Sequence, residues 1–148
     1  MNIEGIRILL AEDDTDDCLF FEKALKELKL STQLKIVSDG EQLMNYLNNE
    51  CGIKDLPPLP DIVFLDLSMP RKTGYECLTE IKESEKLKGV SVVVLSTSFP
   101  KDIKYEQDLA DMLTGIGAYH FVRKPSDFEQ LKELILNVLK NLSAKKAS

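Results

Sequence analysis

The sequence is poor in the residues that most zinc and hydrolytic sites need. Its 148 residues include one histidine, His120, and three cysteines, Cys18, Cys51 and Cys77. No cluster of Cys and His has metal-ligand spacing, so structural zinc and Ser-His-Asp hydrolysis are both disfavoured. The cysteines are odd in number and form no CxxC pattern, which favours reduced thiols in a cytoplasmic protein.

The sequence also has no excess of positive charge and no long apolar run, and we expect no secretory leader. The formal net charge of −6 argues against direct binding to nucleic acid or to an anionic membrane. No run approaches the roughly 20 apolar residues of a membrane span, and the first residues lack the basic and apolar regions of a secretory signal. The composition, 43% hydrophobic and 30% charged, fits one globular domain over residues 1–148 without an output domain. Its core is expected at about 4–142, with a frayed tail at 143–148.

Short apolar runs alternate with helical patterns five times along the chain. The runs that predict strands are 6–11, 34–37, 61–65, 90–95 and 118–122. The first helix is expected to begin after a cap at Asp13, Asp14 or Thr15. Further helices are expected around Leu43 and Leu47, and over 75–87, 101–113 and 128–142. The repeated order predicts an α/β, doubly wound, flavodoxin-like fold with a five-stranded parallel sheet in the order 2-1-3-4-5 and helices on both faces.

Charged and hydroxyl side chains follow four of these runs. Glu12 and Asp13 follow the first, Asp66 the third, Ser96 the fourth and Lys124 the fifth. The carboxyl ends of parallel strands meet at one edge of a sheet, so these groups are expected to share a crevice. Carboxylates suit Mg²⁺, while an ammonium and a hydroxyl suit phosphoryl oxygens. The pattern therefore predicts a site for a divalent cation and a phosphoryl group.

Four motifs resemble the receiver domain of two-component response regulators, in the family's order and over about residues 4–142. They are Ala11-Glu12-Asp13-Asp14, Asp66-x-Ser68-Met69-Pro70-x-x-x-Gly74, Leu95-Ser96-Thr97 and Lys124-Pro125. The long loop before Asp61 and the stretch Leu-Ser-Thr-Ser are similar to those of stand-alone, phytochrome-associated receivers. Two features depart from the usual pattern: a Glu-Asp pair replaces Asp-Asp, and the interval from Ser96 to Lys124 is longer.

The resemblance implies a role for each matching residue. Asp66 would be the phosphoacceptor, and Mg²⁺ would be held by Glu12, Asp13, Asp66 and the backbone carbonyl of Ser68. The resemblance further implies that Ser96 and Phe121 form a switch pair and that Lys124 senses the phosphate. It also implies a cis peptide bond before Pro125.

The function implied is a phosphorylation-dependent signalling switch. A histidine kinase or histidine phosphotransfer protein would supply the phosphoryl group, and the chain would signal by contact with a downstream protein or in a homodimer. It would promote only its own phosphorylation and dephosphorylation, without acting as an enzyme on other substrates. Three alternatives stay open: an Mg²⁺-dependent phosphohydrolase with an aspartyl-phosphate intermediate, a phosphate sink or shuttle, and a flavodoxin-like cofactor binder. The last is disfavoured because Glu12-Asp13-Asp14 would repel a flavin phosphate.

Overall fold

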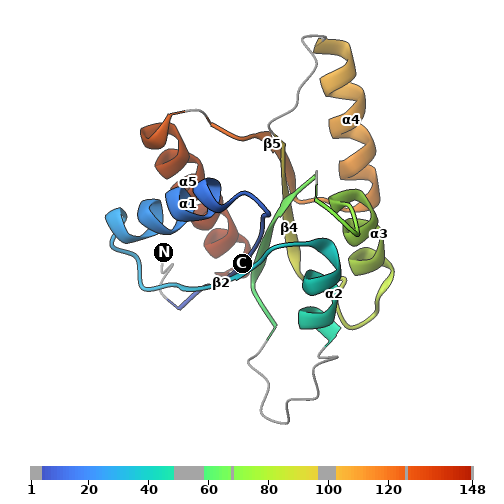
Figure 1. Cartoon of the computed structure of the whole chain (residues 1–148), viewed down its shortest axis with the longest axis horizontal. Helices are drawn as coiled ribbons and strands as arrows, with labels where there is room; N and C mark the ends of the chain where they lie inside the picture. Colours follow the sequence, from blue (N-terminus) through green and yellow to red (C-terminus); the bar gives the residue numbers. More distant parts are fainter. Residues whose placement is uncertain (1–4, 49–58, 68, 97–102, 126, 148) are drawn as a thin grey trace.

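A parallel sheet forms the centre of the molecule (Figure 1). The computed structural model describes residues 5–48, 59–67, 69–96, 103–125 and 127–147. Within these ranges the sheet has five strands: β1 (Arg7–Ala11), β2 (Gln33–Val37), β3 (Ile62–Asp66), β4 (Ser91–Ser96) and β5 (His120–Arg123). Their order is β2-β1-β3-β4-β5, and every neighbouring pair is parallel. The predicted order is confirmed, and the carboxyl ends of the strands share one edge.

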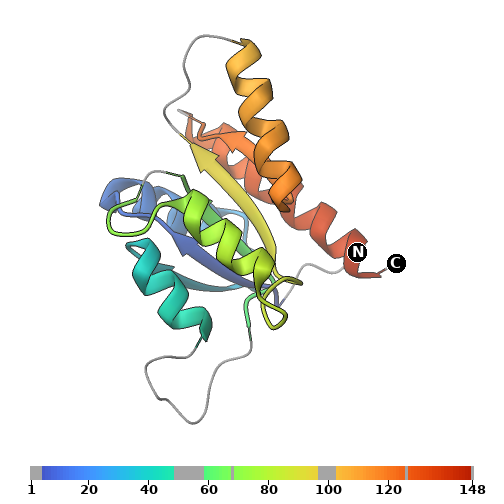
Figure 2. The same cartoon turned by 90° about the vertical axis from the view of Figure 1, so that its right-hand side faces the viewer.

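Helices cover both faces of this sheet (Figures 1 and 2). Those of the described ranges are α1 (Thr15–Glu27), α2 (Gly40–Asn48), α3 (Gly74–Glu83), α4 (Ile103–Ile116) and α5 (Phe128–Ala147). Helices α1 and α5 lie side by side on one face, and α2, α3 and α4 lie on the other. None of the described helices combines the length and apolar character that crossing a membrane requires.

Alternation along the strands divides the core into two layers. In β1, Leu9 packs into the layer beneath α2 and α3, whereas Ile8 and Leu10 pack into the layer beneath α1 and α5. The central strand β3 is buried over its whole length, as expected for a parallel strand with helices on both sides. Phe64 of β3 meets Phe21 of α1 edge to face, with ring centroids 5.0 Å apart.

Two helices end at different places from those predicted. Helix α3 stops at Glu83 instead of residue 87, because Ser84 adopts an extended backbone and its carbonyl and hydroxyl accept from the Leu87 N–H. Leu87 is nevertheless fully buried, beneath the turn that follows α3. Helix α4 runs past residue 113 to Ile116, and Gly117, at a φ of +131°, forms its C-terminal turn.

The C-terminal end and the Pro125 peptide also differ from expectation. The tail from residue 143 was expected to fray, but α5 continues to Ala147 because Leu142 and Ser143 are buried and hold this part of the helix to the domain. The peptide bond between Lys124 and Pro125 is trans, so the expected cis bond is wrong. The tertiary amide before proline itself favours trans by about 0.5–1 kcal/mol.

Candidate functional site

The carboxyl edge of the sheet brings the predicted site residues together. Glu12 follows β1, Asp66 ends β3, Ser96 ends β4, and Lys124 follows β5. Backbone hydrogen bonds continue the ladder past the strand ends, since the Lys124 N–H donates to the Ser96 carbonyl over 2.9 Å. In the same way the Glu12 N–H donates to the carbonyl of Val37 over 3.0 Å. The positions of these side chains are therefore fixed by the sheet.

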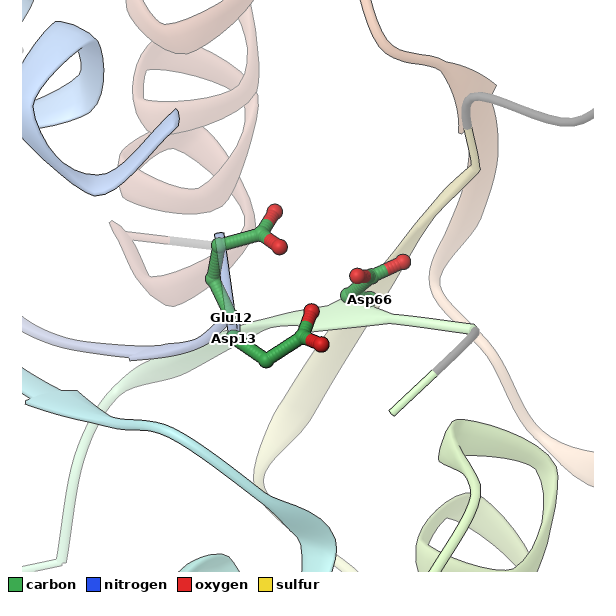
Figure 3. Close-up of side chains that lie close together, drawn as sticks. All are labelled: Glu12, Asp13 and Asp66. Atoms are coloured by element: carbon green, nitrogen blue, oxygen red, sulfur yellow. The ribbon is translucent and has the colours of Figure 1, made fainter. Parts of the chain in front are cut away.

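Glu12, Asp13 and Asp66 form a compact group of carboxylates (Figure 3). One ligand oxygen from each lies within 4.8 Å of the other two. Glu12 and Asp66 are buried, at 2% and 5% exposure, whereas Asp13 is open to solvent. Mg²⁺ holds oxygens at about 2.1 Å, so ligands on opposite sides are about 4.2 Å apart. The three carboxylates are therefore close enough together to be candidate ligands of one divalent cation, and the exposed side of the group leaves room for water ligands.

Lys124 crosses from β5 to this acidic group. Its ammonium donates to Glu12 Oε1 and, over 3.0 Å, to Asp17 Oδ2 of α1. It also lies 3.6 Å from Asp66 Oδ2. The lysine therefore lies within reach of Asp66 while it pairs with two other carboxylates.

Burial and charge change the proton affinity of this group. Burial is the main cause that raises the pKa of Glu12, to about 7; the neighbouring Asp66 also raises it, and the hydrogen bond from Lys124 opposes them. For Lys124, burial acts to lower the pKa, but hydrogen bonds to Glu12 and Asp17 outweigh it and the pKa is raised. Above neutral pH the pair is therefore an ion pair beside Asp66.

The backbone of Asp66 is packed tightly against the start of α3. A Cβ added to Gly74 would lie 2.4 Å from the Asp66 carbonyl oxygen and 2.9 Å from Leu67 Cα. The Gly74 N–H donates to the Leu67 carbonyl over 3.1 Å. Thr73 caps the helix, because its hydroxyl accepts from the Glu76 N–H and the Glu76 carboxylate accepts from the Thr73 N–H. The start of α3 is thereby anchored against the end of β3.

Ser96 and Phe121 lie on the other side of the sheet from Lys124. Ser96 is buried and, by strand alternation, shares the face of Val94, which packs in the layer beneath α2 and α3. Phe121 packs at the border of that same layer and is in register with Val94. Both residues therefore border the layer that α4 covers.

One predicted ligand lies outside the described residues, and one contact was not predicted. Ser68, with its carbonyl, belongs to the part of the chain that the structure does not describe. Asp17, an acidic residue in the first turn of α1, was not predicted to belong to the site, yet it binds Lys124. Its position four residues after Asp13 offers no signal, because the contact depends on where the folded sheet places the start of α1 relative to the end of β5.

Known proteins with similar sequences include several response regulators. A family model described as the response regulator receiver domain matches residues 8–136. Response regulator Rcp1 of Synechocystis sp. is 39% identical over 95 residues, which are 64% of this chain and 64% of Rcp1. The match thus spans slightly less than two thirds of that relative.

Solved structures agree in fold over most of the chain. The phosphorylated cyanobacterial phytochrome response regulator RcpA has a TM-score of 0.77 and 31% identity, covering 90% of this chain and 91% of RcpA. The Mn²⁺-bound form of Rcp1 has a TM-score of 0.76 and 28% identity, with 90% and 91% covered.

Proposed function

The chain belongs to the family of response regulator receiver domains, and on this premise we propose that it accepts a phosphoryl group on Asp66 with the help of Mg²⁺. The donor is a histidine kinase or a histidine phosphotransfer protein. The observation that carries the proposal is the group of three carboxylates within 4.8 Å with the Lys124 ammonium 3.6 Å from Asp66. We assign the exchange to the cytoplasm, in keeping with the free thiols of Cys18 and Cys77.

Glu12, Asp13 and Asp66 would hold the cation, together with the Ser68 carbonyl, which lies outside the described residues. When bound, Mg²⁺ offsets the charge of the carboxylates and of the phosphoryl oxygens. The Mn²⁺-bound form of Rcp1 supports a divalent ion in a related protein. The donor set contains only oxygen, which suits Mg²⁺.

The Asp66 carboxylate is the nucleophile. One of its oxygens attacks the phosphorus of a phosphohistidine, and the new O–P bond forms as the N–P bond breaks. The imidazole keeps the electron pair of the broken bond and takes up a proton. Lys124 exchanges a carboxylate partner for a phosphoryl oxygen, a short movement because its ammonium already lies 3.6 Å from Asp66.

The signal to other proteins depends on a second contact to the phosphoryl group, made by Ser96. Ser96 donates its hydroxyl proton to a phosphoryl oxygen, and the shift of this buried residue is passed to Phe121 on the same face of the sheet. The surface of β5 and the flanking helices then changes for a downstream protein or a second copy of the chain. A switch of this kind biases a two-state element by about 1–3 kcal/mol.

We assign no enzymatic activity on other substrates. The chain promotes its own phosphorylation and hydrolysis of its own aspartyl phosphate. A phosphohydrolase would instead turn over generic phosphomonoesters many times per chain. A phosphate sink would accept the group without a change in partner affinity.

Phosphate labelling tests the acceptor. The parent chain, incubated with labelled acetyl phosphate and Mg²⁺, is expected to take up label that EDTA prevents. Asp66→Asn should abolish uptake. Asp61→Asn is the matched control, because Asp61 precedes the same strand at its opposite end and hydrogen-bonds the Arg7 N–H. Equal labelling of Asp66→Asn and the parent would refute the acceptor assignment.

Partner affinity tests the output separately. Proteins that bind the chain are compared for the bare form, the phosphorylated form and Ser96→Ala. The phosphorylated parent should differ from the bare form in affinity, while Ser96→Ala should lose most of this difference. Equal affinities throughout, with labelling intact, would identify a phosphate sink.

A further inference from the structure

A cavity of about 160 Å³ lies between α1, α5 and the sheet. Helices α1 and α5 lie side by side on one face of the sheet (Figure 1). The lining of the cavity comes mainly from residues of α1, α5 and the sheet. Its described lining includes Glu12 and Lys124 of the phosphoryl site, but neither Asp13 nor Asp66. The cavity thus adjoins the phosphoryl site and is separate from the acceptor carboxylate.

The body of the cavity is apolar and rich in aromatic side chains. Its lining includes Leu10, Phe64 and Leu95 of the strands, which are all buried, and Phe21 of α1. Phe20, which is more than half exposed, borders the cavity on the side of solvent. An apolar cavity of about 150 Å³ is large enough to bind benzene. The apolar part therefore matches one aromatic ring in size and chemistry.

One end of the cavity is polar and carries an excess of negative charge. Three carboxylates, those of Glu12, Asp17 and Asp127, face one ammonium, that of Lys124. All four lie at the carboxyl edge of the sheet, because they follow β1 or β5 or begin α1 and α5. The Asp17 side chain is 38% exposed, so its carboxylate can accept from a further donor besides Lys124. A cation is favoured at this end over an anion.

We propose that this cavity is a binding site for a small aromatic amine. The ring lies among Phe21, Phe64 and Leu95, and the ammonium donates to Asp17 at the polar end. The apolar lining favours an aromatic ring over a polar one, since a buried polar group needs hydrogen-bond partners. The charge of the polar end favours an ammonium over a carboxylate, because three of the four charged side chains in the described lining are acidic.

Phenethylamine and phenylacetate are the matched probes, because they share the ring and differ mainly in the charge of the head group. Titration of the metal-free, unphosphorylated chain followed by NMR measures binding without use of the phosphoryl site. Phenethylamine is expected to bind saturably, with a dissociation constant of about 1 mM or tighter, as befits a ligand of so few atoms. Its ring protons should show nuclear Overhauser contacts to Phe64 and Leu95.

Two variants locate the site. Leu134→Phe adds ring atoms to a lining residue and should weaken phenethylamine at least about tenfold. Leu28→Phe makes the same change in the same core layer, at a residue outside the cavity lining, and should leave the affinity unchanged. The parent is expected to bind phenethylamine at least about tenfold more tightly than phenylacetate. In Asp17→Asn this ratio of affinities should be smaller, because one carboxylate of the polar end is lost.

Each outcome decides the proposal. Saturable binding with ring contacts to Phe64 and Leu95, lost in Leu134→Phe, supports the site. Equal affinity for the two probes would overturn the assignment of a cationic ligand. The absence of saturable binding, or equal loss in Leu134→Phe and Leu28→Phe, would overturn the site itself.

Discussion

Replacing Gly74 with alanine is expected to displace the end of β3 and with it Asp66. The new Cβ would lie 2.4 Å from the Asp66 carbonyl oxygen and 2.9 Å from Leu67 Cα. Both are backbone atoms of a packed strand end, so no side-chain rotation relieves the contact. Real contacts of this kind are at least 3.0 Å, so the two segments must separate by about 0.6 Å or more.

The cost follows from this overpacking. Forcing an added methyl into a packed site costs about 1–3 kcal/mol, and the higher helix propensity of alanine returns up to about 1 kcal/mol. The free energy of unfolding should thus fall by about 1–2 kcal/mol, which lowers Tm by roughly 2–8 °C for a domain of this size. Misplacement of a nucleophile by a fraction of an ångström should slow labelling of Asp66 by about tenfold.

Thermal unfolding and the initial rate of labelling by acetyl phosphate measure the two effects. Gly115→Ala in α4 is the matched control, because no atom lies within 4 Å of the added Cβ. It should raise the free energy of unfolding by up to about 1 kcal/mol and leave labelling unchanged. If Gly74→Ala matched the parent in both Tm and labelling rate, the start of α3 would not position Asp66.

Three further predictions concern a cap, a thiol and a carboxyl group. Thr73→Val removes the hydroxyl that accepts from the Glu76 N–H, so urea denaturation should show the free energy of unfolding lowered by about 1 kcal/mol. The control Thr79→Val, on the same helix, should lower it by less than about 0.5 kcal/mol. Equal losses in the two variants would argue against the cap. Burial raises the pKa of Cys77 to about 12, so in a chain that carries both Cys18→Ser and Cys51→Ser this thiol should react with a disulfide reagent at pH 8 only as fast as the protein unfolds. Faster reaction would contradict its burial. Because burial raises the pKa of Glu12 to about 7, the native state holds one more proton than the unfolded state in weakly acidic solution. The free energy of unfolding of the metal-free chain should therefore fall as pH rises toward 7. An equal fall in Glu12→Gln would refute this prediction.

Much of the fold was predictable because its pattern is local. Apolar runs 6–11 and 90–95 contain no charged residue other than Arg7, which is only half-buried, so the sequence predicts parallel strands that are buried on both sides. Strand order and the placement of Glu12, Asp66 and Lys124 at one edge then follow from topology. The cap of α1 is also a local feature: Asp14, one of three candidates that the sequence offered, accepts from the Asp17 N–H.

The parts that were not predicted depend on packing between distant segments. The pairing of Lys124 with Asp17 joins residues more than 100 positions apart and needs the relative placement of α1 and β5. The close approach of Gly74 to Asp66 is invisible in a motif, which marks a glycine without saying which atoms it must avoid. The third helix was predicted to continue to Leu87, although this residue lies six residues after Ile81 and does not continue that helical face.

Chemical trapping of the phosphorylated residue tests the central claim most directly. The chain is phosphorylated with acetyl phosphate and Mg²⁺, reduced with sodium borohydride, digested and sequenced by mass spectrometry. Reduction converts an aspartyl phosphate to homoserine, so homoserine is expected at position 66 and not at Asp13 or Asp61, with none formed when EDTA replaces Mg²⁺. Homoserine at another aspartate, or none at position 66 in a fully labelled sample, would contradict the account.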